Sequence, residues 1–234
     1  MSRTALQAVD VSAFSVKPVE AIDFLRRKLD VPSWSWLDLW QQQHSVAFTV
    51  AGATTNDLVA DFHDAVDKAI SEGTTLEDFR KDFDRIVEDH GWSYNGSRNW
   101  RSAVIFDTNI SMAYSAGRWE QIQRVKSRRP YLMYKHLPGQ QNPRPEHEAW
   151  DGLVLLADDP WWQTHFPPNG WFCHCWVESL SDDDLKRYGY KLGTAPPIKV
   201  VPYIVYGRTI EVPEGIDPGF AYRPGEQPVA EDAY

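Results

Sequence analysis

The only two cysteines of the chain, Cys173 and Cys175, stand one residue apart. Thiolates at this spacing can bind one zinc ion, which takes four ligands and prefers cysteine sulfur and histidine nitrogen at structural sites. His147 is the best third ligand, because the turn-rich stretch between residues 147 and 173 can fold it back onto the cysteines. The sequence therefore predicts a structural zinc site on Cys173, Cys175 and His147. Its fourth ligand stays open among four side chains: His136, His165, His174 and Asp151.

The same residues also permit an interpretation without metal, in which both cysteines are small buried side chains. In that case we expect His147 to hydrogen-bond the turn at residues 167–170. Arg144 is then expected to pair with Asp151 or Asp158. A disulfide between two thiols this close is a poor alternative for a protein of a reducing compartment.

Catalysis by these groups is a separate hypothesis. A cysteine with His147 could form a thiol nucleophile and its base. His147 with Asp151 could transfer protons, as in a nuclease. The chain has no Gly-rich phosphate loop, no Gly-x-Ser-x-Gly elbow and no His-Glu-x-x-His helix. The residue types therefore favour a protein that is not an enzyme.

The formal net charge of −9 argues against a dedicated DNA-binding protein, because contacts to phosphates require basic side chains. One run of basic side chains is a local exception, which we interpret as a solvated helix end. The alternative interpretation is that this run binds DNA ends. The run consists of Arg118, Arg124, Lys126, Arg128 and Arg129.

Neither a signal peptide nor a membrane span is expected. Residues 1–16 lack a basic start followed by an apolar run. No apolar stretch reaches the length that crosses a bilayer. We therefore expect a protein made in the cytoplasm, with no membrane partner.

Helical periodicity dominates from about residue 18 to residue 126. Apolar residues recur at steps of three and four between residues 56 and 72, which predicts an amphipathic helix that ends at Gly73. A second helix is expected from Thr74 or Thr75 to residue 90, and a third from about residue 99 to residue 126. Three short strands and a polar helix are expected after Pro130, at residues 131–136, 153–156, 176–179 and 181–188.

The last forty residues hold seven of the sixteen prolines. Proline blocks helix and removes backbone donors, so we expect an extended arm with one strand-like segment at residues 200–206. The fold class predicted is α+β, with a mainly helical N-terminal half, a small mixed sheet and this Pro-rich tail. The expected divisions are an N-terminal extension, a helical domain, a Cys-x-Cys module and the arm, at residues 1–17, 18–126, 127–195 and 196–234.

Several ordered motifs resemble the Mu F-like minor head proteins of tailed phages, also called phage head-morphogenesis proteins. The C-terminal motifs of that family are Arg-Pro-x-His, a nearby Gly, Asp-Asp-Pro-x-Trp and Pro-Pro-Asn-Gly-x-x-Cys-Arg-Cys. Here they are Arg144-Pro-Glu-His147, Gly152, Asp158-Asp-Pro-Trp-Trp162 and Pro167-Pro-Asn-Gly-Trp-Phe-Cys-His-Cys175. Upstream landmarks such as Gly91-Trp92, Thr108-Asn109 and Tyr114-x-Ala-Gly-Arg118 follow in family order. The resemblance covers roughly residues 18 to 190 and departs at His174, where the family usually has Arg.

The resemblance implies a structural protein of the capsid interior, needed for head morphogenesis or DNA packaging near the portal. Its implied partners are the portal protein, the major capsid protein or both, with packaged DNA as a further one and no small-molecule substrate. Its location would be the virion, and the host cytoplasm during assembly. The alternative is an enzyme delivered with the phage genome, a nuclease or a nucleotide-modifying transferase. The resemblance also supports zinc, because the histidine and both cysteines recur in the family as one unit.

Overall fold

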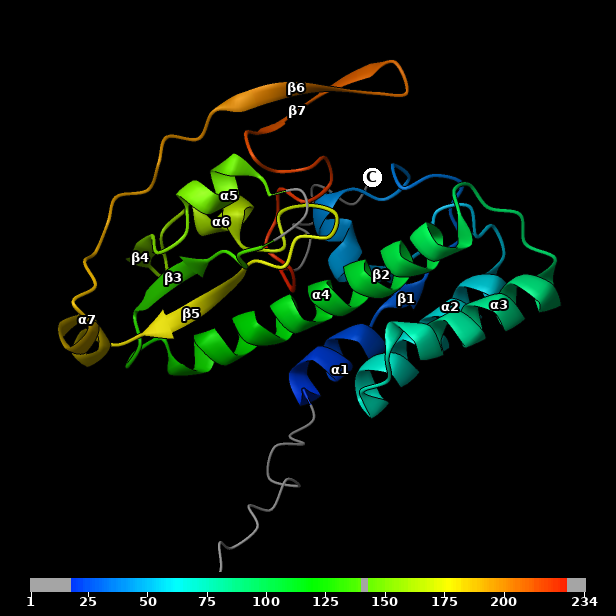
Figure 1. Ribbon diagram of the computed structural model, residues 1–234, viewed down its shortest axis with the longest axis horizontal. Coiled ribbons are helices and arrows are strands. Elements are labelled where there is room, and N and C mark those ends of the chain that lie inside the picture. The colour runs from blue at the N-terminus through cyan, green and yellow to red at the C-terminus, as the bar shows by residue number, and fades with distance from the viewer. Residues whose placement is uncertain (1–17, 140–142, 227–234) are drawn as a thin grey trace, which may run out of the picture.

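The structure is a computed structural model that describes residues 18–139 and 143–226 (Figure 1). The predicted N-terminal extension, residues 1–17, lies outside these residues. The described part combines helices with three small sheets, which confirms the α+β class. None of its helices has the combination of length and apolarity needed to cross a bilayer.

Four helices make up most of the N-terminal half, and capping residues set their ends. Helix α2 ends where Gly73 adopts a left-handed conformation with φ 68°, which favours glycine. The hydroxyl of Thr75 accepts a hydrogen bond from the Asp78 amide and so begins α3. These two helices and the long one after them confirm the predicted positions. The bounds are α1 Val19–Arg26, α2 Asn56–Glu72, α3 Leu76–His90 and α4 Arg98–Val125.

The first hydrophobic core lies where α1, α2 and α3 pack together and against α4. Phe62 of α2 and Phe79 of α3 are both buried in it. Gly117 allows α4 to lie directly against α1, because a Cβ at this position would stand 2.8 Å from the Ala21 backbone nitrogen. A short parallel pair, β1 (Leu29–Asp30) and β2 (Ala47–Phe48), and the 3₁₀ helix η2 (Gln41–Ser45) complete this half.

The second core lies between α4 and a three-stranded sheet of order β4-β3-β5. A mixed sheet was predicted, but β3 pairs antiparallel with both of its neighbours. The chain runs opposite to β3 in both β4 and β5, so no parallel crossover is needed. Figure 1 shows α4 running beneath the sheet, with two short helices on the other side. The bounds are β3 Tyr131–Lys135, α5 Pro145–Ala149, β4 Val154–Leu156, α6 Trp162–His165 and β5 Trp176–Leu180.

A hairpin follows the polar helix α7 (Asp182–Tyr188) and an extended linker. Its strands β6 (Val200–Val205) and β7 (Arg208–Pro213) pair with each other and project from the body (Figure 1). The two turn residues, Tyr206 and Gly207, both have positive φ, as a tight two-residue hairpin turn requires. Strand β6 was predicted, whereas its partner strand was not.

The prediction of an extended arm from residue 196 onward was wrong for residues 212–222. Val212 is buried, and Ile216, Phe220 and Tyr222 are buried in the second core. The ring of Phe220 lies 4.9 Å from that of Trp171. Proline prevents regular backbone pairing but does not prevent burial, and these apolar side chains gain free energy by leaving water. The Pro-rich segment therefore returns to the body instead of trailing from it.

Candidate metal centre

The strand register brings the residues of the candidate site together. Strands β3 and β5 pair antiparallel with Lys135 opposite Trp176. The next position in this register places His136, just after β3, opposite Cys175, just before β5. Cys173 follows in the same loop, two residues further from the strand. The sheet edge therefore fixes where the Cys-x-Cys loop lies relative to His136.

Helix α5 presents His147 to this loop. Pro145 occupies the first turn, where its missing amide costs no hydrogen bond. The imidazole of His147 is 2% exposed and stacks on Trp150 at 5.2 Å between ring centroids. A short helix packed on an indole therefore fixes the orientation of the histidine.

The three predicted ligands form one compact cluster. His147 Nδ1 lies 3.6 Å from Cys173 Sγ and 3.5 Å from Cys175 Sγ. All three ligand atoms lie within 4.8 Å of one another. In a tetrahedral zinc site, with Zn–S about 2.3 Å and Zn–N about 2.05 Å, a nitrogen and a sulfur ligand stand about 3.5 Å apart. The geometry of the cluster therefore fits three ligands of one such metal ion.

A hydrogen bond on the side of the His147 ring that faces away from the cysteines fixes the tautomer of the imidazole. Nε2 lies 2.7 Å from the Gly215 carbonyl oxygen, which can only accept a hydrogen bond. Nε2 therefore carries the proton, and the lone pair of Nδ1 faces the two sulfur atoms. Metal-binding histidines are commonly oriented in this way by a backbone carbonyl.

The two thiols do not have equal acidities in the metal-free protein. Hydrogen bonding by Cys175 holds the pKa of Cys173 well below its usual range. The same hydrogen bond and burial raise the pKa of Cys175. A metal ion bound by both sulfurs would take them as thiolates and displace any thiol proton.

Of the four candidates for a fourth ligand, the structure brings only His136 to the cysteines. Its Nδ1 lies 3.4 Å from Cys175 Sγ. The Asp151 carboxylate instead accepts a hydrogen bond from the His136 amide at 2.9 Å. His165 is stacked on Trp161 at 4.2 Å.

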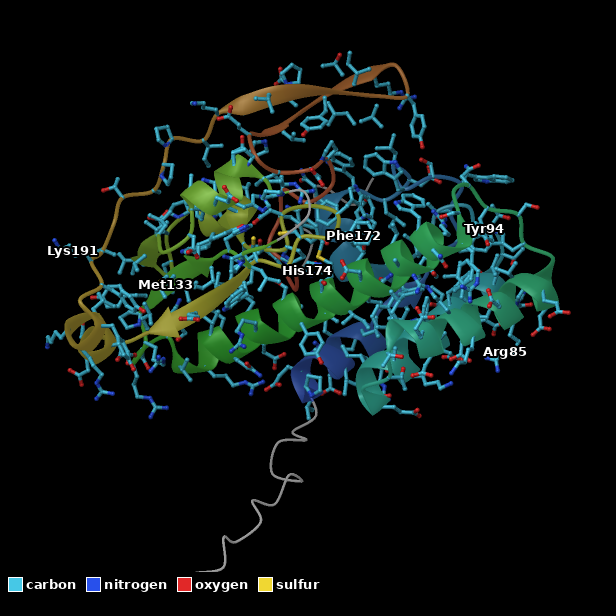
Figure 2. The ribbon with its side chains drawn as sticks, in the orientation of Figure 1. Arg85, Tyr94, Met133, Phe172, His174 and Lys191 are labelled. Carbon is cyan, nitrogen blue, oxygen red and sulfur yellow. The ribbon has the colours of Figure 1, made fainter. Side chains whose placement is uncertain are left out.

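His174, the middle residue of the Cys-x-Cys motif, points away from the sulfurs. It lies next to α4 (Figure 2), with Nδ1 3.8 Å from a carboxylate oxygen of Asp107. Its side chain remains 38% exposed. The motif therefore turns its two sulfurs inward and its central histidine outward.

Sequence reasoning missed the C-terminal residues that support the site. Asp217 accepts hydrogen bonds from the Arg144 guanidinium at 2.5 Å and from the Trp171 amide at 2.9 Å. The expectation that Arg144 pairs with Asp151 or Asp158 was therefore wrong. The expected bond from His147 to the turn at residues 167–170 was also wrong, because Gly215 takes that place. The turn sequence Asp217-Pro218-Gly219 was the available signal, but no local pattern says which loop such a turn contacts.

Of the two catalytic pairs considered from the sequence, the structure brings together the cysteine–histidine pair, with His147 Nδ1 3.5 Å from the partly exposed Cys175, and separates the other. His147 and Asp151 hold other partners, so no His–carboxylate pair forms between them. Cys173 is only 4% exposed, which leaves its sulfur little access to a substrate. A cavity of about 690 Å³ does open beside the cluster, lined in part by Arg144, Phe172 and His174. The arrangement thus places two cysteines and a histidine together beside a cavity.

Comparison with known proteins places these features in a family. The family model described as Phage Mu protein F like protein matches residues 60–178, a range that includes His147, Cys173 and Cys175. The putative capsid assembly protein F of Escherichia phage Mu is 33% identical over 201 residues, which cover 80% of this chain and 46% of that protein. The Mu-like prophage FluMu F protein of Haemophilus influenzae is 32% identical over 173 residues, covering 70% of this chain and 42% of that protein.

This chain thus spans less than half the length of each of these two relatives. No solved structure gives a significant match. The family match over half of the chain, together with the two relatives, shows that this protein belongs to the Phage Mu protein F like family.

Proposed function

We propose that this protein is a structural component in the assembly of a phage head. The phage Mu relative is named a putative capsid assembly protein, which supports this role. The observation that carries a structural rather than a catalytic function is the burial of the ligand cluster, in which His147 and Cys173 are 2% and 4% exposed. We place the protein in the capsid interior near the portal, with the portal protein or the major capsid protein as its partner.

Deletion of the gene from an inducible prophage tests this role. We expect the lysate to contain few infectious particles, with aberrant or empty heads by electron microscopy. Complementation with the parent gene should restore intact heads, and the protein should co-purify with capsids. Normal particle numbers and a normal DNA content after deletion would contradict the proposal.

We further infer that the cluster binds zinc, in a structural role. Two thiolates and an imidazole are ligands that zinc prefers. A bound metal ion commonly stabilises a segment with little regular structure. The expected result is one equivalent of zinc in protein purified without added metal. The Cys173→Ser/Cys175→Ser double variant should lose the zinc and melt at a lower temperature. Metal well below one equivalent in the parent, with unchanged melting in the variant, would exclude the site.

A nuclease or a nucleotide-modifying transferase delivered with the genome is the second candidate function. The cavity beside the cluster is the feature that favours it. The test is turnover of DNA or of a nucleotide by the purified protein. If His147→Ala abolishes this turnover while the variant still folds, the protein has a catalytic function besides the structural one. His90→Ala serves as the control, because His90 contacts Asp61 and does not line the cavity.

A DNA-end-binding role receives little support from the basic run. Three of its five side chains have acidic partners: Arg124 with Glu20 and Glu120, Lys126 with Asp158, and Arg129 with Asp184. These contacts reduce the positive charge available to phosphates. Steeply salt-dependent binding to duplex DNA ends would restore this alternative.

A further inference from the structure

His136 differs from the other histidines near the cluster in how its ring is held. Its backbone is fixed, because the amide donates to Asp151 and the residue follows directly on β3. Its ring contacts Cys175 Sγ through Nδ1 at 3.4 Å. Nε2 is buried and has no hydrogen-bond partner among the described residues. The contact with Cys175 Sγ, a weak hydrogen-bonding group, is therefore the polar contact that holds this ring among the described residues.

A buried polar atom without a partner is costly, so its presence requires an explanation. Binding of a metal ion would explain one feature of the ring with either nitrogen: ligation through Nε2 would give that atom a partner, whereas ligation through Nδ1 would account for its position beside Cys175 Sγ. The 3.4 Å separation from Cys175 is close to the distance of about 3.5 Å expected between nitrogen and sulfur ligands of one zinc ion. The ring gives up only this weak sulfur contact when it moves toward the ion.

The other three candidates make contacts that a movement toward the sulfurs would break. His165 is stacked on an indole, and its Nδ1 lies 2.8 Å from the Thr164 hydroxyl. His174 faces Asp107 on the other side of the loop. Asp151 holds the His136 amide and also lies 3.3 Å from Lys135 Nζ. Each would have to give up a contact in order to reach the sulfurs.

We infer that His136 is the fourth ligand, so that two cysteines and two histidines enclose the metal ion. This inference rests on the proposed zinc site. His147 and the two cysteines already stand at ligand separations, whereas His136 contacts only Cys175 of these three. Its imidazole must therefore move toward His147 and Cys173 when metal binds. The resulting site has no open coordination position, which is typical of structural rather than catalytic zinc.

Cobalt substitution in the full chain tests this assignment. Co²⁺ in a closed site of two sulfur and two nitrogen ligands gives the strong visible absorption of a tetrahedral complex. We expect His136→Ala to weaken and shift these bands, and to lower zinc affinity, measured against a chelator, by at least about 100-fold, the upper end of what outer-shell residues cost. The matched control, His174→Ala, should leave both the spectrum and the affinity unchanged.

A second variant keeps the test decisive if His136→Ala fails to fold. His136→Cys supplies a third thiolate at the same position, so the sulfur-to-cobalt charge-transfer band should intensify in that variant and not in His174→Cys. Parent-like spectra and affinity in both His136 variants, with stoichiometric metal in the parent, would overturn the role of His136 but leave the zinc site in place. Absence of metal from the parent would overturn the proposed zinc site itself.

Discussion

The carboxylate of Asp217 accepts a hydrogen bond from the guanidinium of Arg144 at 2.5 Å, although the two residues are 73 positions apart in sequence. The same Asp217 oxygen accepts from the Trp171 amide, two residues before Cys173. One carboxylate thus joins the start of α5, the Cys-x-Cys loop and the C-terminal segment. The candidate metal centre therefore has support from a part of the chain that a local motif does not include.

Replacement of Asp217 should loosen all three segments. We expect Asp217→Ala to lower the free energy of unfolding by about 2 kcal/mol, less than the 3–5 kcal/mol of a fully buried pair, because both side chains keep some exposure. Urea denaturation of the metal-free protein measures this effect. The control is Glu214→Ala, since the Lys199–Glu214 pair is exposed and should contribute less than about 1 kcal/mol. Equal losses in the two variants would argue against a special role for Asp217.

Gly117→Ala offers a test in which two effects oppose each other. Helix propensity alone favours alanine in a helix interior by about 1 kcal/mol. The added Cβ would, however, stand 2.8 Å from backbone nitrogen of Ala21, and backbone cannot move aside as a flexible side chain can. We expect the clash to dominate, with a net destabilisation of about 1–3 kcal/mol. Thermal melting measures the sign, and a higher melting temperature would mean that α1 shifts away freely.

Lys28 should make stability depend on pH in the alkaline range. It is 8% exposed, and burial lowers the pKa of its amine to about 7. His44 lies near it, with a pKa lowered to about 4 by burial and by Lys28. The unfolded chain binds a proton at its ordinary pKa of 10.5, well above the folded value. The folded state is therefore favoured above pH 10.5 and loses stability as the pH falls toward 7.

We accordingly expect Lys28→Met to melt at a higher temperature than the parent at pH 7. The difference in unfolding free energy should shrink by up to about 1.4 kcal/mol for each pH unit between 7 and 10. Urea denaturation across this range measures it, with the exposed Lys191→Met as the control. A difference that does not change with pH would show that Lys28 stays protonated in the folded protein.

Limited proteolysis tests how the C-terminal segment is held. Trypsin should cut the exposed linker first, at Lys191. Because Ile216, Phe220 and Tyr222 are buried in the second core, the cleaved fragment should stay bound and elute with the body from a sizing column. Separation of the fragment under native conditions would mean that the segment contributes little to the core.

The strongly periodic helices could be predicted from the sequence because their own apolar stripes and caps define them. The stripe that includes Phe62 and the cap at Thr75 are local features, and both have the expected structure. The cluster of Cys173, Cys175 and His147 could also be anticipated, since zinc chemistry limits the ligand types. The proximity of His136, rather than His165, to Cys175 could not, because it depends on the β3–β5 register.

The C-terminal segment shows a different limit of sequence reasoning. Proline content indicates what backbone hydrogen bonding is possible, whereas burial depends on the surface that the rest of the fold presents. Phe220 is buried because Trp171 and its neighbours leave an apolar surface at that place. Likewise, Gly215 supports His147 only through a contact across 68 positions. Such partners are set by tertiary structure and leave no pattern in the local sequence.

The late position of residues 212–222 also sets an order of events during synthesis. The ribosome releases the first core, β3 and the Cys-x-Cys loop before it adds the residues that cover Trp171 and hold His147. Until then, the nascent chain exposes aromatic surface that the finished protein buries, a state prone to aggregation. Closure of the second core thus follows the release of the first core and the Cys-x-Cys loop. A premature stop codon before residue 212 should consequently yield an insoluble product rather than a shortened but folded one.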